Sequence, residues 1–188
     1  MCCGGVPTKL ARACAPDDHR LAGGWRHRNR IHVSTRGFIR SLELYGHRFS
    51  SYTQKVLVAL YENATPFEFR CIAPDEPQHV AEWLRRWPLR KFPLLVDGER
   101  SIVETSIIIE YLQLVHPGPL QLLPSDPMAA LQVRFFDRYF DLHIMDAAQH
   151  AVDVALTGDP VKRREGQALA QAKLEPAYAW LVWGSRSK

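Results

Sequence analysis

The chain has 188 residues, of which 46% are hydrophobic and 23% charged, an ordinary balance for one or two globular domains. The formal charge is +4, but residues 1–40 hold eight Lys/Arg and two Asp, whereas residues 41–188 hold 16 basic and 18 acidic residues. The first segment is thus +6 and the remainder −2, which argues against nucleic-acid binding by the predicted domains. No apolar run approaches the ~18 residues of a membrane span, so no membrane segment is predicted.

Residues 1–40 contain two Gly-Gly pairs, scattered arginines and no hydrophobic periodicity. This composition predicts a disordered basic leader; an over-extended reading frame or an Arg-rich targeting segment are the alternative interpretations. Three of the four cysteines lie in this segment, and none of the four has the spacing of a zinc site or a disulfide framework. A reducing cytoplasm fits this usage best. Cys71, on a predicted strand, is expected to be a small buried apolar residue.

The predicted elements follow in order from residue 41. In turn they are a strand, a polar loop, an apolar helix that ends at Asn63, a second strand and a short amphipathic helix: Leu42–Tyr45, Gly46–Ser51, Lys55–Tyr61, Thr65–Ile72 and His79–Trp87. Alternating Phe67 and Phe69 indicate the second strand, and a 3.6-residue apolar period indicates the helices.

The stretch Pro88–Leu112 organises what comes next. Two short strands, Leu94–Val96 and Ser101–Val103, flank Asp97-Gly98, a strong signal for a two-residue hairpin. A helix is predicted to begin near Glu104-Thr105, with Thr105 as its N-cap. Pro93 precedes the first strand, where it is either a strand-edge proline or part of a cis peptide bond.

The remainder is predicted to be helical. Pro117-Gly118-Pro119 ends the preceding helix, and Asp126-Pro127 starts one of up to thirty residues, because an N-cap aspartate followed by proline favours a helix start. Asp159-Pro160 repeats this signal for a helix that reaches about Trp183.

The order of these elements resembles that of the glutathione S-transferases, over about residues 42–183. The resemblance implies an α/β thioredoxin-like domain (βαβαββα) at residues 41–117, a linker at 118–126 and a partial all-α domain at 127–188. The chain looks like a C-terminally shortened member, similar to the bacterial, serine-type, zeta- and theta-like enzymes. Ser50-Ser51-Tyr52 in place of the zeta pattern Ser-Ser-Cys makes a zeta-type isomerase a less favoured option.

The resemblance also implies a site for glutathione. Ser50, with Ser51 as the neighbouring candidate and Tyr52 as a weaker one, is expected to donate a hydrogen bond that favours the thiolate of glutathione. Helix capping is the structural alternative for either serine. The loop has no cysteine, which excludes disulfide exchange there.

Five further residues are implied to bind the tripeptide. Phe92 would pair with its backbone through the residue before a cis Pro93, and Lys91 would face the glycyl carboxylate. Glu104 would meet the γ-glutamyl ammonium group, and Thr105, with the helix N–H groups, its α-carboxylate.

The implied activity is glutathione transfer to a small electrophile in the cytoplasm, with glutathione as co-substrate and no metal or other cofactor. Phe135, Tyr139 and His143 are candidates for the electrophile site, although aromatic residues at this spacing more often belong to a core or a dimer interface. A homodimer is expected if the helical domain is completed. The alternative is a non-catalytic binding module that lacks the last helices of the family.

Overall fold

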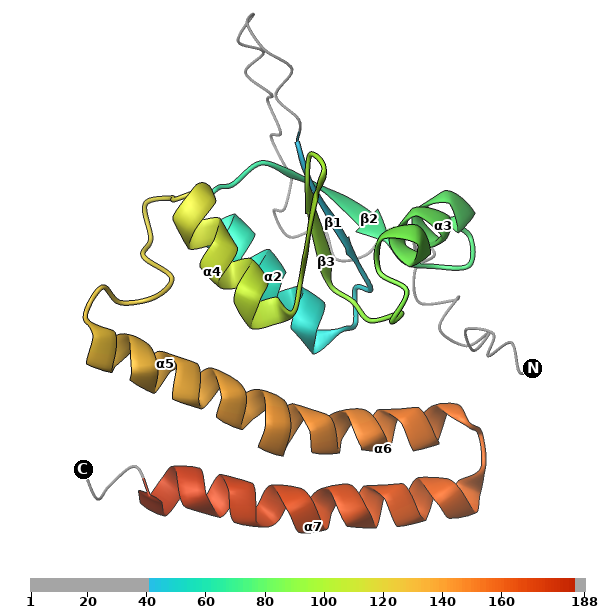
Figure 1. Cartoon of the computed structure of the whole chain (residues 1–188). Helices are drawn as coiled ribbons and strands as arrows, with labels where there is room; N and C mark the ends of the chain where they lie inside the picture. The colour runs from blue at the N-terminus through green and yellow to red at the C-terminus, as the bar shows by residue number, and fades with distance from the viewer. Residues whose placement is uncertain (1–40, 185–188) are drawn as a thin grey trace, which may run out of the picture. The chain divides into compact units, whose positions relative to one another are not determined.

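The computed structural model describes residues 41–184 (Figure 1). The prediction of a disordered leader at residues 1–40 lies outside this range. The described chain divides into two compact units between Ile108 and Ile109. The predicted domain limits at residues 117 and 126 stay predictions.

The first unit has the predicted order of strands and helices. Its elements are β1 (Leu42–Gly46), α2 (Ser51–Glu62), β2 (Phe67–Cys71), α3 (Pro77–Arg86), β3 (Leu94–Asp97), β4 (Arg100–Val103) and the start of α4 (Thr105–Val115). This βαβαββα order confirms the thioredoxin-like arrangement.

The four strands form one mixed sheet in the order β2-β1-β3-β4. β1 runs parallel to β2, with Leu42 opposite Phe67, and antiparallel to β3. Figure 1 shows α2 and the start of α4 on one side of the sheet and α3 on the other. Because both faces of the central strands are covered, Leu44, Leu94 and Leu95 are fully buried, which is typical of strands inside such a sheet.

The hairpin between β3 and β4 differs from the prediction by one residue. Asp97 still pairs with Arg100, so the two-residue loop is Gly98-Glu99 rather than Asp97-Gly98. Gly98 has a φ of 61°, and a two-residue hairpin with glycine in its first loop position has the pattern of a type II′ turn. The requirement for a positive φ at the first loop position therefore sets the register.

The start of α4 also lies one residue from its predicted place. The backbone N–H of Ile108 donates to the carbonyl of Glu104 at 2.9 Å, which makes Glu104 the N-cap and Thr105 the first helical residue. Glu104 has a φ of 66°, a left-handed conformation that is unfavourable for a residue with a Cβ. Threonine is usually the better N-cap, but the path of the chain after β4 places Glu104 at this position instead of Thr105.

The second unit contains α5 (Pro127–Tyr139), a π-helix η1 (Phe140–Met145), α6 (Asp146–Leu156) and α7 (Pro160–Gly184). The predicted N-caps are confirmed: Asp126 accepts from the N–H of Ala129 at 2.7 Å, and Asp159 from that of Val161 at 2.9 Å. The predicted long helix is helical throughout, but the six-residue π-helix in its middle was not foreseen.

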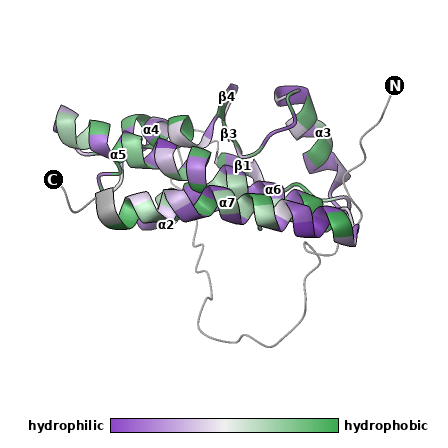
Figure 2. Ribbon diagram, turned by 90° about the horizontal axis from the view of Figure 1, so that it is seen from below, coloured by the Kyte–Doolittle hydropathy of each residue, from purple (hydrophilic) through white to green (hydrophobic). Residues whose placement is uncertain are grey.

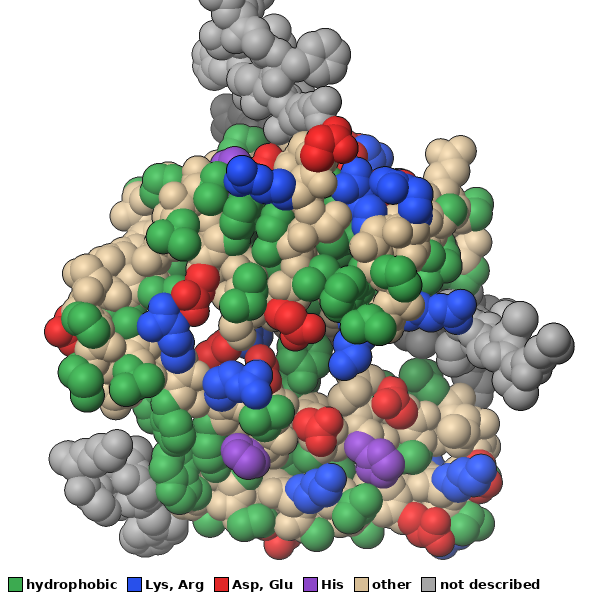
Figure 3. Space-filling view, in the orientation of Figure 1, with side chains coloured by type: hydrophobic (Ala, Val, Ile, Leu, Met, Phe, Trp, Pro, Cys, Tyr) green, Lys and Arg blue, Asp and Glu red, His purple; other side chains and the backbone are tan. Residues whose placement is uncertain are grey.

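The helices of the second unit pack closely where small residues allow it. A Cβ on Gly166 of α7 would lie 2.2 Å from Cγ2 of Val154 on α6. Hydrophobic and hydrophilic residues alternate along α7 (Figure 2), and hydrophobic side chains are interspersed with charged ones on the visible surface (Figure 3). Within residues 41–184, no helix is both long and apolar enough to cross a membrane.

Candidate functional site

Ser50 lies at the N-terminus of α2, in an extended conformation with φ −79° and ψ 120°. Its Oγ accepts a hydrogen bond from the N–H of Thr53 at 3.2 Å, and its own N–H donates to the carbonyl of His47 at 3.0 Å. A hydroxyl that accepts one bond still has its proton to donate. Half-buried Ser50 can therefore cap the helix and donate to a ligand at once.

Ser51 and Tyr52 are the first two residues of α2, and both are half-buried. Only Ser50 occupies the N-cap position, where the positive end of the helix dipole acts on a neighbouring anion. The geometry of the loop thus distinguishes Ser50 from the other two hydroxyl candidates.

Gly46 brings the first turn of α2 against the end of β1. A Cβ at this position would lie 2.6 Å from both Oγ1 and Cγ2 of Thr53. Thr53 is fully buried, and its Oγ1 has no hydrogen-bond partner in the described part of the chain. Because Gly46 has no side chain, the first turn of α2, and with it Ser50, can lie close to the sheet.

The peptide bond between Phe92 and Pro93 is cis, as predicted. Pro93 is buried, Phe92 is half-buried and Lys91 is exposed. Among residues 41–184, no hydrogen-bond partner is found for the backbone N–H or C=O of Phe92. Both groups are thus available to a ligand.

Two aromatic residues that the sequence analysis did not single out flank Phe92. The indole N–H of Trp83 on α3 donates to the carbonyl of Lys91 at 2.9 Å, and the Trp83 and Phe92 rings lie 5.9 Å apart. The His47 ring lies 6.3 Å from that of Phe92. A hydrogen bond from Trp83 could have been expected from the sequence, because the N–H of a buried indole generally finds an acceptor.

Glu104 is exposed and precedes the N-terminus of α4. Its side chain can meet a cation, while the positive end of α4 favours an anion. Thr105 is only 7% exposed, so the helix end is more accessible to a ligand than the Thr105 hydroxyl.

The register of the sheet brings these segments together. Tyr45 on β1 lies opposite Leu94 on β3, and Leu94 lies opposite Val103 on β4. The loop that leads to Ser50, the segment Lys91–Pro93 and Glu104-Thr105 therefore all meet the sheet at the same end. Because neighbouring strands lie only ~4.8 Å apart, one small ligand can reach all three segments.

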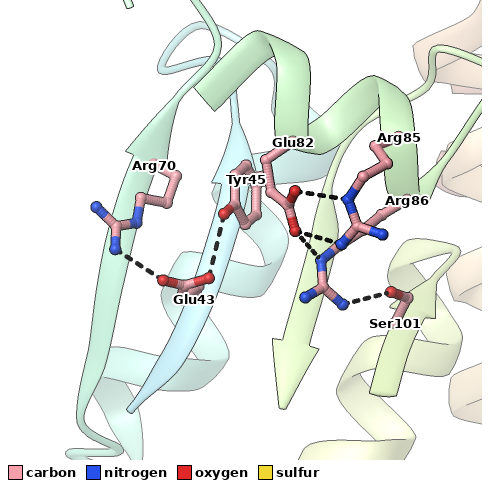
Figure 4. A network of polar contacts seen from close by, with 7 residues as sticks. All are labelled: Glu43, Tyr45, Arg70, Glu82, Arg85, Arg86 and Ser101. Carbon is pink, nitrogen blue, oxygen red and sulfur yellow. Dashed lines mark hydrogen bonds and ion pairs between the residues drawn. The ribbon is translucent and has the colours of Figure 1, made fainter. Parts of the chain in front are cut away.

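A polar network fixes α3 on the other face of the sheet (Figure 4). Glu82 forms ion pairs with Arg85 and Arg86, and Arg86 also donates to the Ser101 hydroxyl on β4 at 3.3 Å. Hydrogen bonds from Arg85 and then Arg86 lower the pKa of Glu82 to about 2. The network ties the helix that carries Trp83 to the edge strand.

Glu43 is the centre of a second part of this network. It accepts hydrogen bonds from Tyr45 at 3.1 Å and from Arg70 at 2.7 Å. Burial, followed by the charge of Glu43, raises the pKa of Tyr45 to about 12. The hydrogen bond from Arg70 to Glu43 joins β2 to β1 (Figure 4).

The aromatic candidates for the electrophile site belong to the second unit. Tyr139 stacks on Trp180 at 4.7 Å, and its ring lies 6.0 Å from that of Phe135 and 5.0 Å from that of His143. Its hydroxyl donates to the carbonyl of Ala177 at 2.7 Å. The cluster joins α5 and η1 to α7, and a role toward an electrophile stays a prediction.

Among the described residues, no group of three His, Cys, Asp or Glu side chains is placed to hold a metal ion. Cys71 forms no disulfide bond within the described part of the chain and is buried, as predicted.

Residues 44–120 match the family model of the glutathione S-transferase N-terminal domain. The chain is 31% identical over 146 residues to glutathione S-transferase U13 of Arabidopsis thaliana, covering 75% of this chain and 60% of that protein. It is 35% identical over 97 residues to a probable maleylacetoacetate isomerase of Vibrio cholerae, covering 50% of this chain and 45% of that protein. The chain thus spans about half the length of these curated relatives.

Solved structures have the same fold. Human glutathione transferase theta-2, in complex with glutathione, aligns with a TM-score of 0.65 and 26% identity over 75% of this chain and 60% of that chain. A family member from Pseudomonas fluorescens Pf-5, with bound glutathione, aligns with a TM-score of 0.63 and 25% identity over 75% of this chain and 70% of that chain.

Proposed function

We propose that this chain, whose residues 44–120 match the family model of the glutathione S-transferase N-terminal domain, is a member of that family that binds glutathione and favours its thiolate for attack on a small electrophile. The observation that carries the proposal is the register that collects Ser50, Phe92 and Glu104 at one end of the sheet. The glutathione-bound structures of related proteins support this function over a non-catalytic binding module. We further propose that the protein is cytoplasmic and forms a homodimer.

In this proposal Ser50 acts on the sulfur. Its Oγ accepts from the N–H of Thr53, so the hydroxyl proton is directed away from the helix and can be donated to the thiolate. A hydrogen bond to the charged form, together with the positive end of α2, lowers the pKa of the thiol. More of the glutathione is then in the nucleophilic form at neutral pH. Ser51 is the neighbouring candidate for the same role.

The rest of the tripeptide is held by the other two segments. The N–H and C=O of Phe92, which have no partner among residues 41–184, fit the peptide backbone of glutathione. Glu104 fits the γ-glutamyl ammonium group, and Thr105, at the N-terminus of α4, fits the adjoining carboxylate. Lys91 is exposed on the same segment as Phe92 and suits the glycyl carboxylate.

Calorimetric titration with glutathione tests the proposal. We expect the unmodified chain to bind glutathione, and Glu104→Gln to weaken binding about ten-fold or more, because a hydrogen bond to a charged group contributes ~1.5–3 kcal/mol. Glu99→Gln is the matched control, since Glu99 is an exposed glutamate in the hairpin loop at the other end of the sheet. Absence of binding to the unmodified chain would overturn the proposed function.

A further inference from the structure

Residues 87–93 connect α3 to β3 and carry two of the proposed glutathione ligands, Lys91 and Phe92. This connection is irregular, and Arg90 has a left-handed φ of 57°. Three hydrogen bonds in the described part of the chain restrain it: the N–H of Trp87 donates to the carbonyl of Trp83 at 2.8 Å, the N–H of Arg90 to the carbonyl of Trp87 at 3.1 Å, and the indole N–H of Trp83 to the carbonyl of Lys91 at 2.9 Å. Of these three, the bond from the indole acts directly on the peptide unit that joins Lys91 to Phe92.

The bond from Trp83 sets the direction of a backbone N–H. The Lys91 carbonyl and the Phe92 N–H belong to one peptide plane, and in a trans peptide these two groups point in opposite directions. The bond between Lys91 and Phe92 is trans. Since the Lys91 carbonyl points toward the indole of α3, the Phe92 N–H points away from α3. Here it has no partner in the described part of the chain.

Trp83 is well placed for such a role because it is itself fixed. Its side chain is 5% exposed and packs in a cluster of buried residues with Tyr45, Ile72, Leu94 and Val96. Its helix is tied to β4 through the contact between Arg86 and Ser101 (Figure 4). A rigid donor of this kind restrains a loop at little further entropic cost.

The same packing reaches the Ser50 loop. The centroid of the Phe92 ring lies 5.9 Å from that of Trp83 and 6.3 Å from that of His47. The carbonyl of His47 accepts the N–H of Ser50. A continuous series of contacts therefore links Trp83 to both the backbone-binding residue and the proposed thiolate donor.

We propose that Trp83 is a positioning residue for glutathione: its indole N–H holds the Lys91 carbonyl so that the Phe92 N–H faces the peptide backbone of the ligand. The inference rests on the proposed function. It also assigns a purpose to an aromatic residue that would otherwise count only as part of the core.

Trp83→Phe tests the inference, because it keeps an aromatic ring and removes the donor. Trp87→Phe is the matched control: Trp87 is at the end of the same helix and packs against the same cluster, and its indole makes no hydrogen bond in the described part of the chain. We expect the dissociation constant for glutathione to rise roughly three- to ten-fold in Trp83→Phe, as for the loss of one neutral hydrogen bond. It should stay unchanged in Trp87→Phe.

A second measurement reads the loop without any ligand. Backbone NMR order parameters of Lys91 and Phe92 are expected to fall in Trp83→Phe and to keep their values in Trp87→Phe. If Trp83→Phe does not fold, replacing the indole by the benzothiophene of 3-benzothienylalanine removes the N–H at nearly constant shape.

The outcomes separate the two proposals. If the unmodified chain binds glutathione and loss of the Trp83 N–H changes neither the affinity nor the order parameters, the inference is overturned and the proposed function stands. If the unmodified chain does not bind glutathione, the proposed function is overturned, and the role of Trp83 toward glutathione fails with it.

Discussion

Ser50 combines a structural and a proposed chemical role, and substitutions can separate them. Its Oγ caps α2 through the N–H of Thr53, and loss of a serine N-cap costs about 0.5–2 kcal/mol. We expect Ser50→Ala to lower the free energy of unfolding by about 1 kcal/mol, and Ser50→Asp, which keeps a capping oxygen, to stay near the original value. Urea denaturation measures both.

Ser51→Ala is the control for this effect. Ser51 is the first residue inside α2, where its side chain is not the capping group, so the change is expected within about 0.5 kcal/mol. An equal loss in Ser50→Ala and Ser51→Ala would show that the assigned cap is wrong.

Glu104 shows a conflict between stability and the proposed binding role. Its φ of 66° is unfavourable for glutamate and favourable for glycine. We expect Glu104→Gly to unfold at a urea concentration at least as high as that of the unmodified chain, and to bind glutathione more weakly because the carboxylate is lost. A clear drop in stability would show that the Glu104 side chain, and not its backbone conformation, supports α4.

The residues that sequence reasoning did not find are those whose role depends on a distant partner. The hydroxyl loop, the proline before β3 and the pair Glu104-Thr105 were singled out because the order of elements resembles that of the glutathione S-transferases. Trp83 could be placed only on the apolar side of a helix, because its acceptor, the Lys91 carbonyl, depends on the path of the loop. His47 lies in a polar loop, and only the fold shows that its ring packs near Phe92.

At the scale of elements, the order of strands and helices was predicted correctly, while their ends were not always. The hairpin loop and the cap of α4 each shifted by one residue because a positive φ at Gly98 and Glu104 sets the chain path. The π-helix η1 interrupts a stretch whose composition favours a continuous α-helix. An inserted π turn depends on tertiary packing, which local propensity does not encode.

The contact between α6 and α7 predicts that replacing Gly166 by alanine destabilises the protein, although alanine normally stabilises a helix relative to glycine. Alanine favours a helix over glycine by up to ~1 kcal/mol, but a Cβ on Gly166 would lie 2.2 Å from Cγ2 of Val154. We expect overpacking, at ~1–3 kcal/mol, to prevail, so that Gly166→Ala lowers the melting temperature. Adding Val154→Ala should recover part of the loss. A higher melting temperature in Gly166→Ala alone would contradict the close packing of these helices.

The ion pairs on α3 predict that the free energy of unfolding depends on pH in the acid range. The pKa of Glu82 is lowered from 4.5 to about 2 in the folded chain, so the unfolded chain binds a proton at Glu82 more readily. The contribution of Glu82 is therefore complete above about pH 4.5 and is lost as the pH falls toward about 2. The difference in unfolding free energy between the unmodified chain and Glu82→Gln should shrink across this interval. A constant difference would contradict the lowered pKa.

At the scale of the whole molecule, the site is a product of topology. Its three segments are far apart in the sequence, near residues 50, 92 and 104, and meet because antiparallel β3 lies between β1 and β4. In the proposed site no single segment holds the whole ligand, so binding and thiolate formation are expected to respond to different substitutions. Changes at Glu104 or Trp83 should act on affinity, whereas changes at Ser50 should act on the sulfur.

The ionisation of bound glutathione tests the central claim most directly. Ultraviolet absorbance of the thiolate, followed against pH with saturating glutathione, reports the pKa of the bound thiol. We predict that the unmodified chain lowers this pKa below that of free glutathione, and that Ser50→Ala raises it again by about one to two units, as for a lost hydrogen bond to a charged group. A bound thiol with the pKa of free glutathione, or one that is equally shifted in Ser50→Ala, would contradict the serine mechanism.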